Sequence, residues 1–268
     1  MTSDHDVSDD ANLLPMTAQA TVPPVPPDAR ADLAPTGKLR AGINLGNVIL
    51  AQKDPATGEW RGVAIDLTRE LARRLDVQVE IVPFQSVGAM VDAAKTGAWD
   101  IAFMGSDPAR EGEITFTAAY VELDATYLVP AGSRLQAVAE VDRDGVKVAA
   151  PARANYELFL TRSLKHAQLV RGDDAGAAFA LLVSGKVDAL AGLTQQLHGL
   201  VGKLPGSRVL EGRFLGVQQS MGVPKGRDAG ARYLRGFVEE AKASGLVAKA
   251  IEKTSARGVS VAPKAPAA

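Results

Sequence analysis

The sequence has no cysteine among its 268 residues, which excludes disulfides and thiolate metal sites. Histidine is nearly as scarce. His5, His166 and His198 are far apart in the sequence, so none forms a pair of metal ligands at helical spacing. We therefore expect no metal and no cofactor.

Long apolar runs are missing as well. No stretch approaches the ~20 consecutive apolar residues that a bilayer-spanning helix requires, so we expect no membrane insertion. The N-terminal MTSDHDVSDD is acidic and no apolar run follows it, which does not match a secretory signal. As it stands, the sequence predicts a cytoplasmic protein.

The chain has almost no net charge. Thirty Lys and Arg residues face 31 Asp and Glu residues, and no block of basic residues stands out. A nucleic-acid-binding surface therefore has no electrostatic support. The remaining composition, 46% hydrophobic and 23% charged, is that of a globular protein long enough for a substantial core.

Composition changes at both ends of the chain. Residues 1–37 hold six of the 15 prolines, few aromatic residues and an acidic start. Such a segment buries too little apolar surface to offset the entropy lost on ordering. We predict a disordered Pro-rich arm over residues 1–37 and a disordered tail over residues 256–268.

Between these ends, strand and helix patterns alternate. Ala64, Leu67, Leu71 and Leu75 fall on one face of a predicted amphipathic helix. The first half of the chain reads as strand, helix, strand, helix, strand over residues 38–45, 63–75, 77–82, 87–95 and 100–104. This order predicts a parallel sheet covered by helices.

The same rhythm restarts after residue 130. Strands are predicted at 146–149, 168–170 and 187–191, with helices at 155–165, 175–184 and 194–201. Extended segments near residues 125–130 and 218–223 are natural places for the chain to cross between two halves. The fold class is therefore α/β with two lobes, each a mostly parallel sheet flanked by helices, joined by two crossings.

An ordered set of motifs resembles the family 3 bacterial solute-binding proteins, the polar amino-acid-binding class with the type II periplasmic-binding-protein fold. The set begins with GKLRAGI and GEWRGVAIDLTRELARRLDVQVEIVPF, continues with TGAWDIAFMGSDPAREGEITFTAAY, and ends with SGKVDALAGL and AKASGLVAKAIEK. The resemblance covers about four fifths of the chain. It implies a two-lobed protein that closes on a small ligand, with lobe one at residues 38–127 plus 223–255 and lobe two at residues 128–222.

The resemblance also implies a ligand anchor at Arg110. Arginine at this position of the family holds the ligand carboxylate, and a guanidinium presents paired N–H donors that match two carboxylate oxygens. The alternative is a surface arginine paired with Asp107 or Glu111. Asp107 has two interpretations of its own, as the cap of the turn that follows it or as the partner of a ligand ammonium group.

Three departures from the family pattern concern the ligand. The stretch from Asn44 to Leu50 lacks the aromatic ring usual there, and Leu193 stands where amino-acid binders often carry an ammonium-binding aspartate. The lobe-two loop from Pro151 to Tyr156 contains Arg153, a candidate second cation. A carboxylate on Arg110 remains expected, whereas a standard α-amino acid loses its usual ammonium partner.

Six further residues complete the candidate ligand-binding site. They share a place in the motif, in the loops around it or at a crossing: Gly105, Ser106, Asn47, Ser86, Asn155 and Gln218. Asn155 is also a candidate helix cap, Gln218 a candidate hinge residue, and Ser86 follows a strand at its carboxyl end, where open α/β sheets bind ligands.

The sequence favours non-catalytic binding of a small anionic or zwitterionic ligand. The chain would then be the substrate-binding component of an ABC-type transporter or a free-standing solute sensor, and the family's usual role implies a periplasmic location as the alternative to the cytoplasm. A lyase of the cyclohexadienyl dehydratase type on the same fold is the enzymatic alternative. It would need a general acid in the cleft, and Asp107 is the only obvious carboxylate there.

Overall fold

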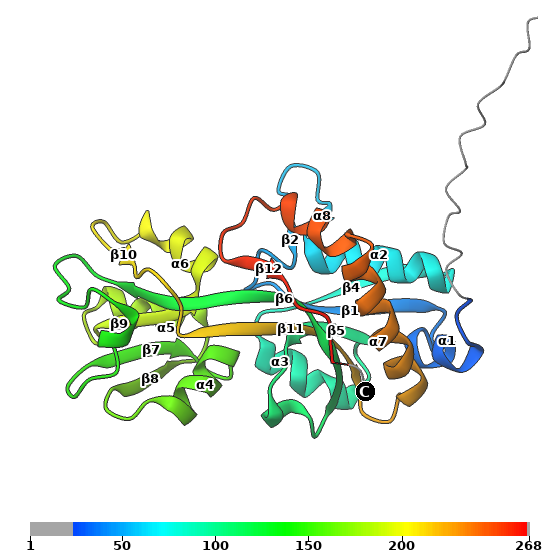
Figure 1. Cartoon of the computed structure of the whole chain (residues 1–268), viewed down its shortest axis with the longest axis horizontal. Coiled ribbons are helices and arrows are strands. Elements are labelled where there is room, and N and C mark those ends of the chain that lie inside the picture. Colours follow the sequence, from blue (N-terminus) through cyan, green and yellow to red (C-terminus); the bar gives the residue numbers. More distant parts are fainter. Residues whose placement is uncertain (1–23, 267–268) are drawn as a thin grey trace, which may run out of the picture.

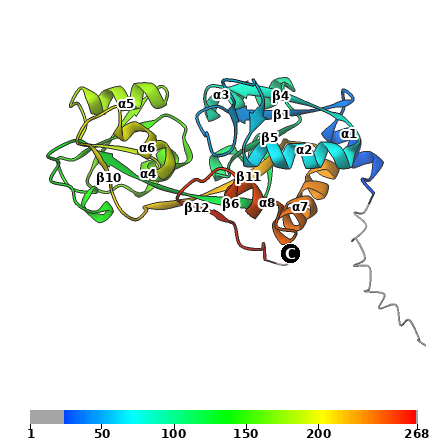
Figure 2. The same ribbon diagram turned by 90° about the horizontal axis from the view of Figure 1, so that it is seen from above.

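A computed structural model describes residues 24–266 of the chain. Figure 1 shows two lobes side by side, joined by the long strands β6 (Ile114–Val129) and β11 (Leu215–Pro224). Figure 2, seen from above, shows the same two strands passing from one lobe to the other. One sheet continues through both lobes in the order β4-β1-β5-β11-β6-β9-β7-β8.

Lobe one contains the parallel strands predicted for the first half. Strand β1 pairs in parallel with β4 and with β5. The predicted amphipathic helix is confirmed as α2, with Leu67, Leu71 and Leu75 buried and Arg69 and Arg73 exposed. The elements of this lobe are α1 (Pro27–Leu33), β1 (Lys38–Asn44), β2 (Gln52–Lys53), β3 (Trp60–Arg61), α2 (Val63–Leu75), β4 (Gln78–Phe84), α3 (Val87–Asp92), the 3-10 helix η1 (Ala93–Thr96), β5 (Ile101–Gly105), the 3-10 helix η2 (Pro108–Arg110), α7 (Asp228–Ala243) and α8 (Leu246–Glu252).

Lobe two repeats the pattern on a smaller scale. Strand β7 lies between β8 and β9 and pairs in parallel with both. A separate apolar cluster, which includes Leu128, Ala178, Leu182 and Leu197, packs helices α5 and α6 against this sheet. The elements are the 3-10 helix η3 (Val138–Glu140), β7 (Lys147–Pro151), α4 (Asn155–Ser163), β8 (Gln168–Gly172), α5 (Ala175–Val183), β9 (Ala189–Leu193), α6 (Thr194–Val201) and β10 (Arg208–Val209).

Strand pairing favours crossings a few residues from their expected positions. In β6, residues 125–128 already pair with β9 of lobe two. In β11, residues 219–222 pair with β5 of lobe one. These pairings favour a change of lobe near residues 122–124 and 215–218, while the bounds 127/128 and 222/223 stay a prediction. The difference arises because both strands are continuous and carry no turn to mark the change of lobe.

Part of the segment predicted to be a disordered arm is helical. Within the expected segment 1–37, residues 27–33 form helix α1, whose Ala29 and Leu33 are almost fully buried. Asp32 accepts a hydrogen bond from the Gly230 N–H of α7 at 2.9 Å. The prediction of disorder is wrong for this part because the burial is tertiary, and residues 1–23 lie outside the described residues.

The C-terminal tail is also partly ordered. Residues 259–261 form β12 (Val259–Val261), which pairs with β6 at Val121 to Leu123. Ala262 is buried, and its N–H donates to the Tyr120 carbonyl at 3.1 Å. The predicted disorder over 256–268 is therefore wrong for this strand, because edge pairing supplies backbone partners that composition does not reveal. Residues 267 and 268 lie outside the described part.

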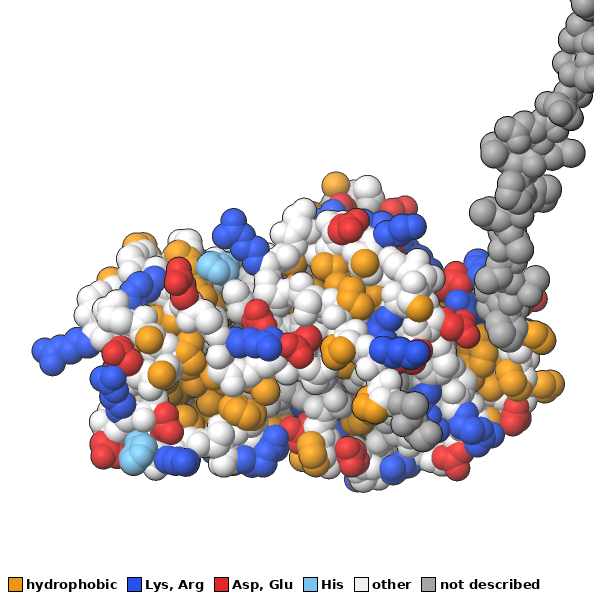
Figure 3. Space-filling view, viewed as in Figure 1, with side chains coloured by type: hydrophobic (Ala, Val, Ile, Leu, Met, Phe, Trp, Pro, Cys, Tyr) orange, Lys and Arg blue, Asp and Glu red, His pale blue; other side chains and the backbone are white. Residues whose placement is uncertain are grey.

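Charged side chains of both signs are interspersed over the face in Figure 3. Across residues 24–266, no helix is both long enough and apolar enough to cross a membrane. In the same residues, no group of three or more His, Asp or Glu side chains is arranged to hold a metal ion.

Candidate functional site

A pocket lies between the lobes, with room of about 60 Å³ for water-sized molecules. Lobe one contributes the ends of β1 and β5 and the loop after β1, and lobe two contributes the start of α4, the end of β9 and part of α6. The lining residues are Asn44, Asn47, Leu50, Val87, Phe103, Met104, Gly105, Ala154, Asn155, Tyr156, Leu193, Gln196, Val217 and Gln219. No charged side chain is among them.

The polar part of this lining consists mainly of carboxamides. Asn44, Asn47, Asn155, Gln196 and Gln219 all contribute, and Asn47 and Gln219 are each only 4% exposed. The Asn47 Oδ1 atom is buried without a hydrogen-bond partner among the described residues. Buried polar atoms of this kind normally find partners, so Asn47 is equipped to bind a donor in the pocket.

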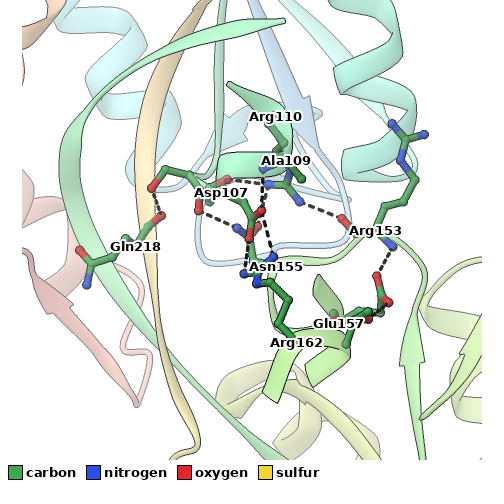
Figure 4. Close-up of polar contacts among 11 residues, drawn as sticks. Asp107, Ala109, Arg110, Arg153, Asn155, Glu157, Arg162 and Gln218 are labelled. Atoms are coloured by element: carbon green, nitrogen blue, oxygen red, sulfur yellow. Dashed lines mark hydrogen bonds and ion pairs between the residues drawn. The ribbon is translucent and has the colours of Figure 1, made fainter. Parts of the chain in front are cut away.

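Arg110 lies beside the pocket, on the 3-10 helix that follows β5 (Figure 4). The residue is 4% exposed, so it is not the surface arginine of the alternative interpretation. Its Nη1 donates to the Gly105 carbonyl at 2.5 Å and to Asn155 Oδ1 at 2.8 Å. Its Nη2 donates to the Arg153 carbonyl at 2.8 Å, which joins the lobes at this point.

All three acceptors of Arg110 are neutral oxygens. Among residues 24–266, no carboxylate lies within ion-pairing distance of its guanidinium. Burial lowers the pKa of Arg110 to about 10, while the charge of Asp107 acts in the opposite direction and that of Arg153 adds to the lowering. A buried cation whose hydrogen-bond acceptors are all neutral is costly, and this makes Arg110 the most unusual charged group beside the pocket.

Asp107 caps the turn that carries Arg110, as one of its two interpretations predicts. Its Oδ1 accepts from the Ala109 N–H at 3.0 Å. The carboxylate also pairs with Arg162 of α4 in lobe two, at 2.9 Å between Oδ2 and Nη2. The alternative role, as partner of a ligand ammonium group, stays a prediction.

Asn155 is the first residue of α4 and reaches across to lobe one. In addition to accepting from Arg110, it donates from Nδ2 to the Ser106 carbonyl at 3.0 Å. A Cβ atom added to Gly105 would overlap the Asn155 carboxamide. The glycine at position 105 therefore provides the close approach that these two bonds require.

Arg153 points its side chain away from the pocket. Its guanidinium forms two hydrogen bonds to Asp92 of α3, at 2.8 and 2.9 Å. Its backbone has φ of 63°, a left-handed conformation that is strained for arginine, and its carbonyl meets Arg110. The role of Arg153 as a second ligand cation stays a prediction, and its visible role is to join the lobes.

The remaining predicted residues occupy different parts of the cleft. Ser86 caps α3 through a bond from the Ala89 N–H and lines a second pocket next to the first. Ser106 donates its N–H to the Gln218 carbonyl at 3.0 Å, and both line a pocket on the opposite side of Asn155. The Gln218 side chain binds Glu122 on β6. Leu193 lies in the wall of the first pocket.

Sequence reasoning did not single out several residues of the cleft. Gln219 rather than Gln218 faces the first pocket, because alternate residues of a strand face opposite sides. Gln196 donates from α6 to the Gly46 carbonyl across the lobes. Arg162 carried no signal, since its role depends on α4 facing the Asp107 turn.

The first pocket continues into two others. A second pocket shares Asn44, Val87 and Tyr156 with it. A third, of about 300 Å³ and mainly apolar, lies against α5 and α6 and shares Tyr156 and Gln196 with the second. The cleft therefore runs from a polar end near Arg110 to an apolar end in lobe two.

Two α/β lobes joined by two strand crossings, with a pocket between them, define the type II periplasmic-binding-protein class. The chain belongs to the bacterial extracellular solute-binding proteins, family 3, whose family model matches residues 42–255. A curated relative is the ABC transporter glutamine-binding protein GlnH of Bacillus subtilis (strain 168). It is 23% identical over 222 residues, which cover 81% of each chain.

Solved structures show the same fold. The solute receptor for L-cysteine of Neisseria gonorrhoeae has a TM-score of 0.72 and 20% identity, over 84% of this chain and 93% of that one. An ancestral amino acid-binding protein, a precursor of cyclohexadienyl dehydratase, has a TM-score of 0.69 and 24% identity, over 84% and 97%. The family and the curated relative are binding proteins, which supports a solute-binding role.

Proposed function

We propose that this chain binds a small carboxylate-bearing metabolite, an amino-acid-like compound or an organic acid, between its lobes. The observation that carries the proposal is the buried Arg110 guanidinium, which has only neutral acceptors around it. A ligand carboxylate would supply the missing counter-charge and match the guanidinium with two parallel hydrogen bonds.

The anchor's position also accounts for closure. Arg110 belongs to lobe one, and its acceptors Asn155 and Arg153 belong to lobe two. A ligand bound here contacts both lobes and therefore favours the closed arrangement over the open one. A ligand that adds its own contacts to both lobes would make the closed surface more persistent in the loaded protein, as a delivery protein requires.

We propose an ABC-type transporter as the partner, on the basis of the relative GlnH. The family is described as extracellular, which favours the periplasmic or external location over the cytoplasm predicted from composition. A free-standing solute sensor is the alternative within the same binding role. Cell fractionation distinguishes the two locations, and recovery in the cytoplasm alone would contradict delivery to a transporter.

The enzymatic alternative has one structural neighbour in its favour, the precursor of cyclohexadienyl dehydratase. The carboxylate it would use as general acid is engaged, because both oxygens of Asp107 accept hydrogen bonds from Arg162 and Ala109. We therefore expect the purified protein not to turn over prephenate or arogenate. Measurable turnover would favour the lyase over the non-catalytic binding protein.

A thermal-shift screen tests the binding proposal directly. The probes are L-glutamine, succinate and phenylpyruvate, which share a carboxylate and differ elsewhere. A probe at 100 times its dissociation constant should stabilise the folded protein by ~2.7 kcal/mol. Arg110→Ala should abolish the shift. Arg110→Lys should lower the affinity for the probe at least ~10-fold, because lysine keeps the charge but loses the paired donors.

The variants separate the anchor from the rest of the cleft. Circular dichroism confirms that each variant is folded, and Arg134→Ala serves as a control that removes an arginine outside the pocket lining. A carboxylate shift that survives Arg110→Ala unchanged would contradict the anchor role. A protein that responds to no carboxylate would contradict the ligand class.

A further inference from the structure

We infer that the Asn155 carboxamide occupies the place beside Arg110 that a ligand carboxylate would take, and that it competes with the carboxylate for this arginine. The inference rests on the proposed function of Arg110 and concerns which group binds this arginine in the closed protein. It makes Asn155 a residue that sets the affinity of the site, rather than a simple helix cap or ligand contact.

The Asn155 carboxamide uses both of its polar atoms on lobe one. Its Oδ1 accepts from Arg110 Nη1 at 2.8 Å, and its Nδ2 donates to the Ser106 carbonyl at 3.0 Å (Figure 4). One planar group thus satisfies both partners: its oxygen accepts from Arg110, and its nitrogen donates to the Ser106 carbonyl. Ala154 occupies the cap position of α4, and the Asn155 side chain binds Arg110 and Ser106 instead of the helix end.

Asn155 also stands between the pocket and the anchor. Asn155 and Gly105 line the pocket, whereas Arg110 is not among its lining residues. A carboxylate that enters the pocket therefore meets the carboxamide before it meets the guanidinium. Displacement of the Asn155 side chain is the step that gives a ligand access to Arg110.

The placement depends on closure, because Asn155 comes from lobe two and its partners from lobe one. Other contacts act in the same direction, namely the pairs Asp107–Arg162 and Asp92–Arg153 and the bond from Gln196 to the Gly46 carbonyl. The protein consequently has a set of its own contacts that hold the lobes together. A ligand must bind Arg110 more strongly than Asn155 does, and this competition lowers the apparent affinity of the protein for the ligand.

A carboxylate is the ligand group that can displace Asn155 from Arg110. The carboxamide is neutral and offers Arg110 one acceptor oxygen, whereas a carboxylate adds a negative charge and a second oxygen that match the paired N–H donors of the guanidinium. Asn155 therefore excludes weakly interacting neutral molecules and yields to an anion. One side chain thus makes binding depend on the negative charge of the ligand.

The test compares three variants with the parent protein, using the same probes, L-glutamine, succinate and phenylpyruvate, in calorimetric titrations. Asn155→Ala should raise the affinity for the responding probe by about 10-fold, because one bond to a charged group no longer has to be broken. Asn155→Asp keeps the shape and supplies a counter-ion for Arg110, although it loses the bond to the Ser106 carbonyl, so it should abolish probe binding. Asp92→Ala is the control, since it removes a contact between the lobes at a residue outside the pocket lining and without releasing Arg110, and it should give no gain.

The outcomes separate this inference from the proposed function. Tighter binding by Asn155→Ala, even where the parent protein binds nothing, supports both. Parent binding that Asn155→Ala leaves equal or weaker overturns the competitor role and leaves the Arg110 proposal standing. Asn155→Asp that still binds like the parent overturns it as well. If neither the parent nor Asn155→Ala binds a carboxylate, the proposed function itself fails.

Discussion

The Asp107 carboxylate of lobe one forms two hydrogen bonds with the Arg162 guanidinium of lobe two, at 2.9 and 3.3 Å. The same carboxylate caps the short helix that carries Arg110. One side chain therefore positions the anchor within its own lobe and attaches that lobe to the other.

The two roles of Asp107 can be separated by substitution. Asp107→Asn keeps a capping oxygen but loses the ion pair, whereas Asp107→Ala loses both and should cost about 1 kcal/mol more. In a double-mutant cycle, Asp107→Asn with Arg162→Met should give a coupling of about 0.5–1 kcal/mol, because solvent screens the half-exposed Arg162. Denaturant unfolding measures both, and a coupling of zero would contradict the pair.

Gly105 should not tolerate a methyl group while Asn155 is in place. Gly105→Ala puts its Cβ into the Asn155 carboxamide, and we expect a loss of about 1–3 kcal/mol of unfolding free energy. Adding Asn155→Ala removes the overlap, so the double variant should resemble Asn155→Ala alone. Gly112→Ala, where the added methyl meets no neighbour, is the control. Equal losses at the two glycines would argue against the overlap.

Leu193 allows a test of the missing ammonium partner that the family resemblance implies. Leu193→Asp places a carboxylate in the pocket wall and should shift the ratio of L-alanine to L-lactate affinity toward alanine by at least ~10-fold, as expected for a charge-assisted bond. Leu193→Asn has the same shape without the charge and should leave the ratio unchanged. The same ratio in both variants would show that Leu193 does not face the ligand's amino group.

The Asp92–Arg153 contact should make the stability of the folded protein sensitive to acid. Hydrogen bonding from Arg153 lowers the pKa of Asp92 below its ordinary value of 3.8. A carboxylate with a lowered folded pKa stabilises the fold above its unfolded pKa and loses that contribution as the pH falls further. The stability difference between the parent and Asp92→Asn should therefore be constant from neutral pH to about 5 and shrink below 3.8. Urea unfolding across this range measures it, and parallel curves throughout would contradict the prediction.

The sequence was informative where local pattern determines structure. The apolar face of residues 63–75 predicted α2 because those positions recur with the helical period. The order of strands and helices predicted parallel pairing of β1 with β4 and β5. The motif around Arg110 identified a residue that lies at the lobe interface, although it could not reveal what that residue contacts.

What could not be predicted depends on contacts between distant segments. Helix α1 orders because α7, 195 or more residues away in sequence, covers Leu33 and Asp32. Asn155 meets Arg110 only because two lobes approach each other, and neither residue's neighbours in the sequence indicate it. The carboxamide character of the pocket likewise appears only when β1, α4, α6 and β11 are brought together.

Strand β12 lies along β6 where that strand leaves lobe one. The connection between the lobes is therefore three strands wide over this stretch, because β11 pairs with the other side of the same residues of β6. Removing residues 259–268 would spare every residue that lines the pocket while making the connection more compliant. The stiffness of the connection and the chemistry of binding therefore depend on different residues.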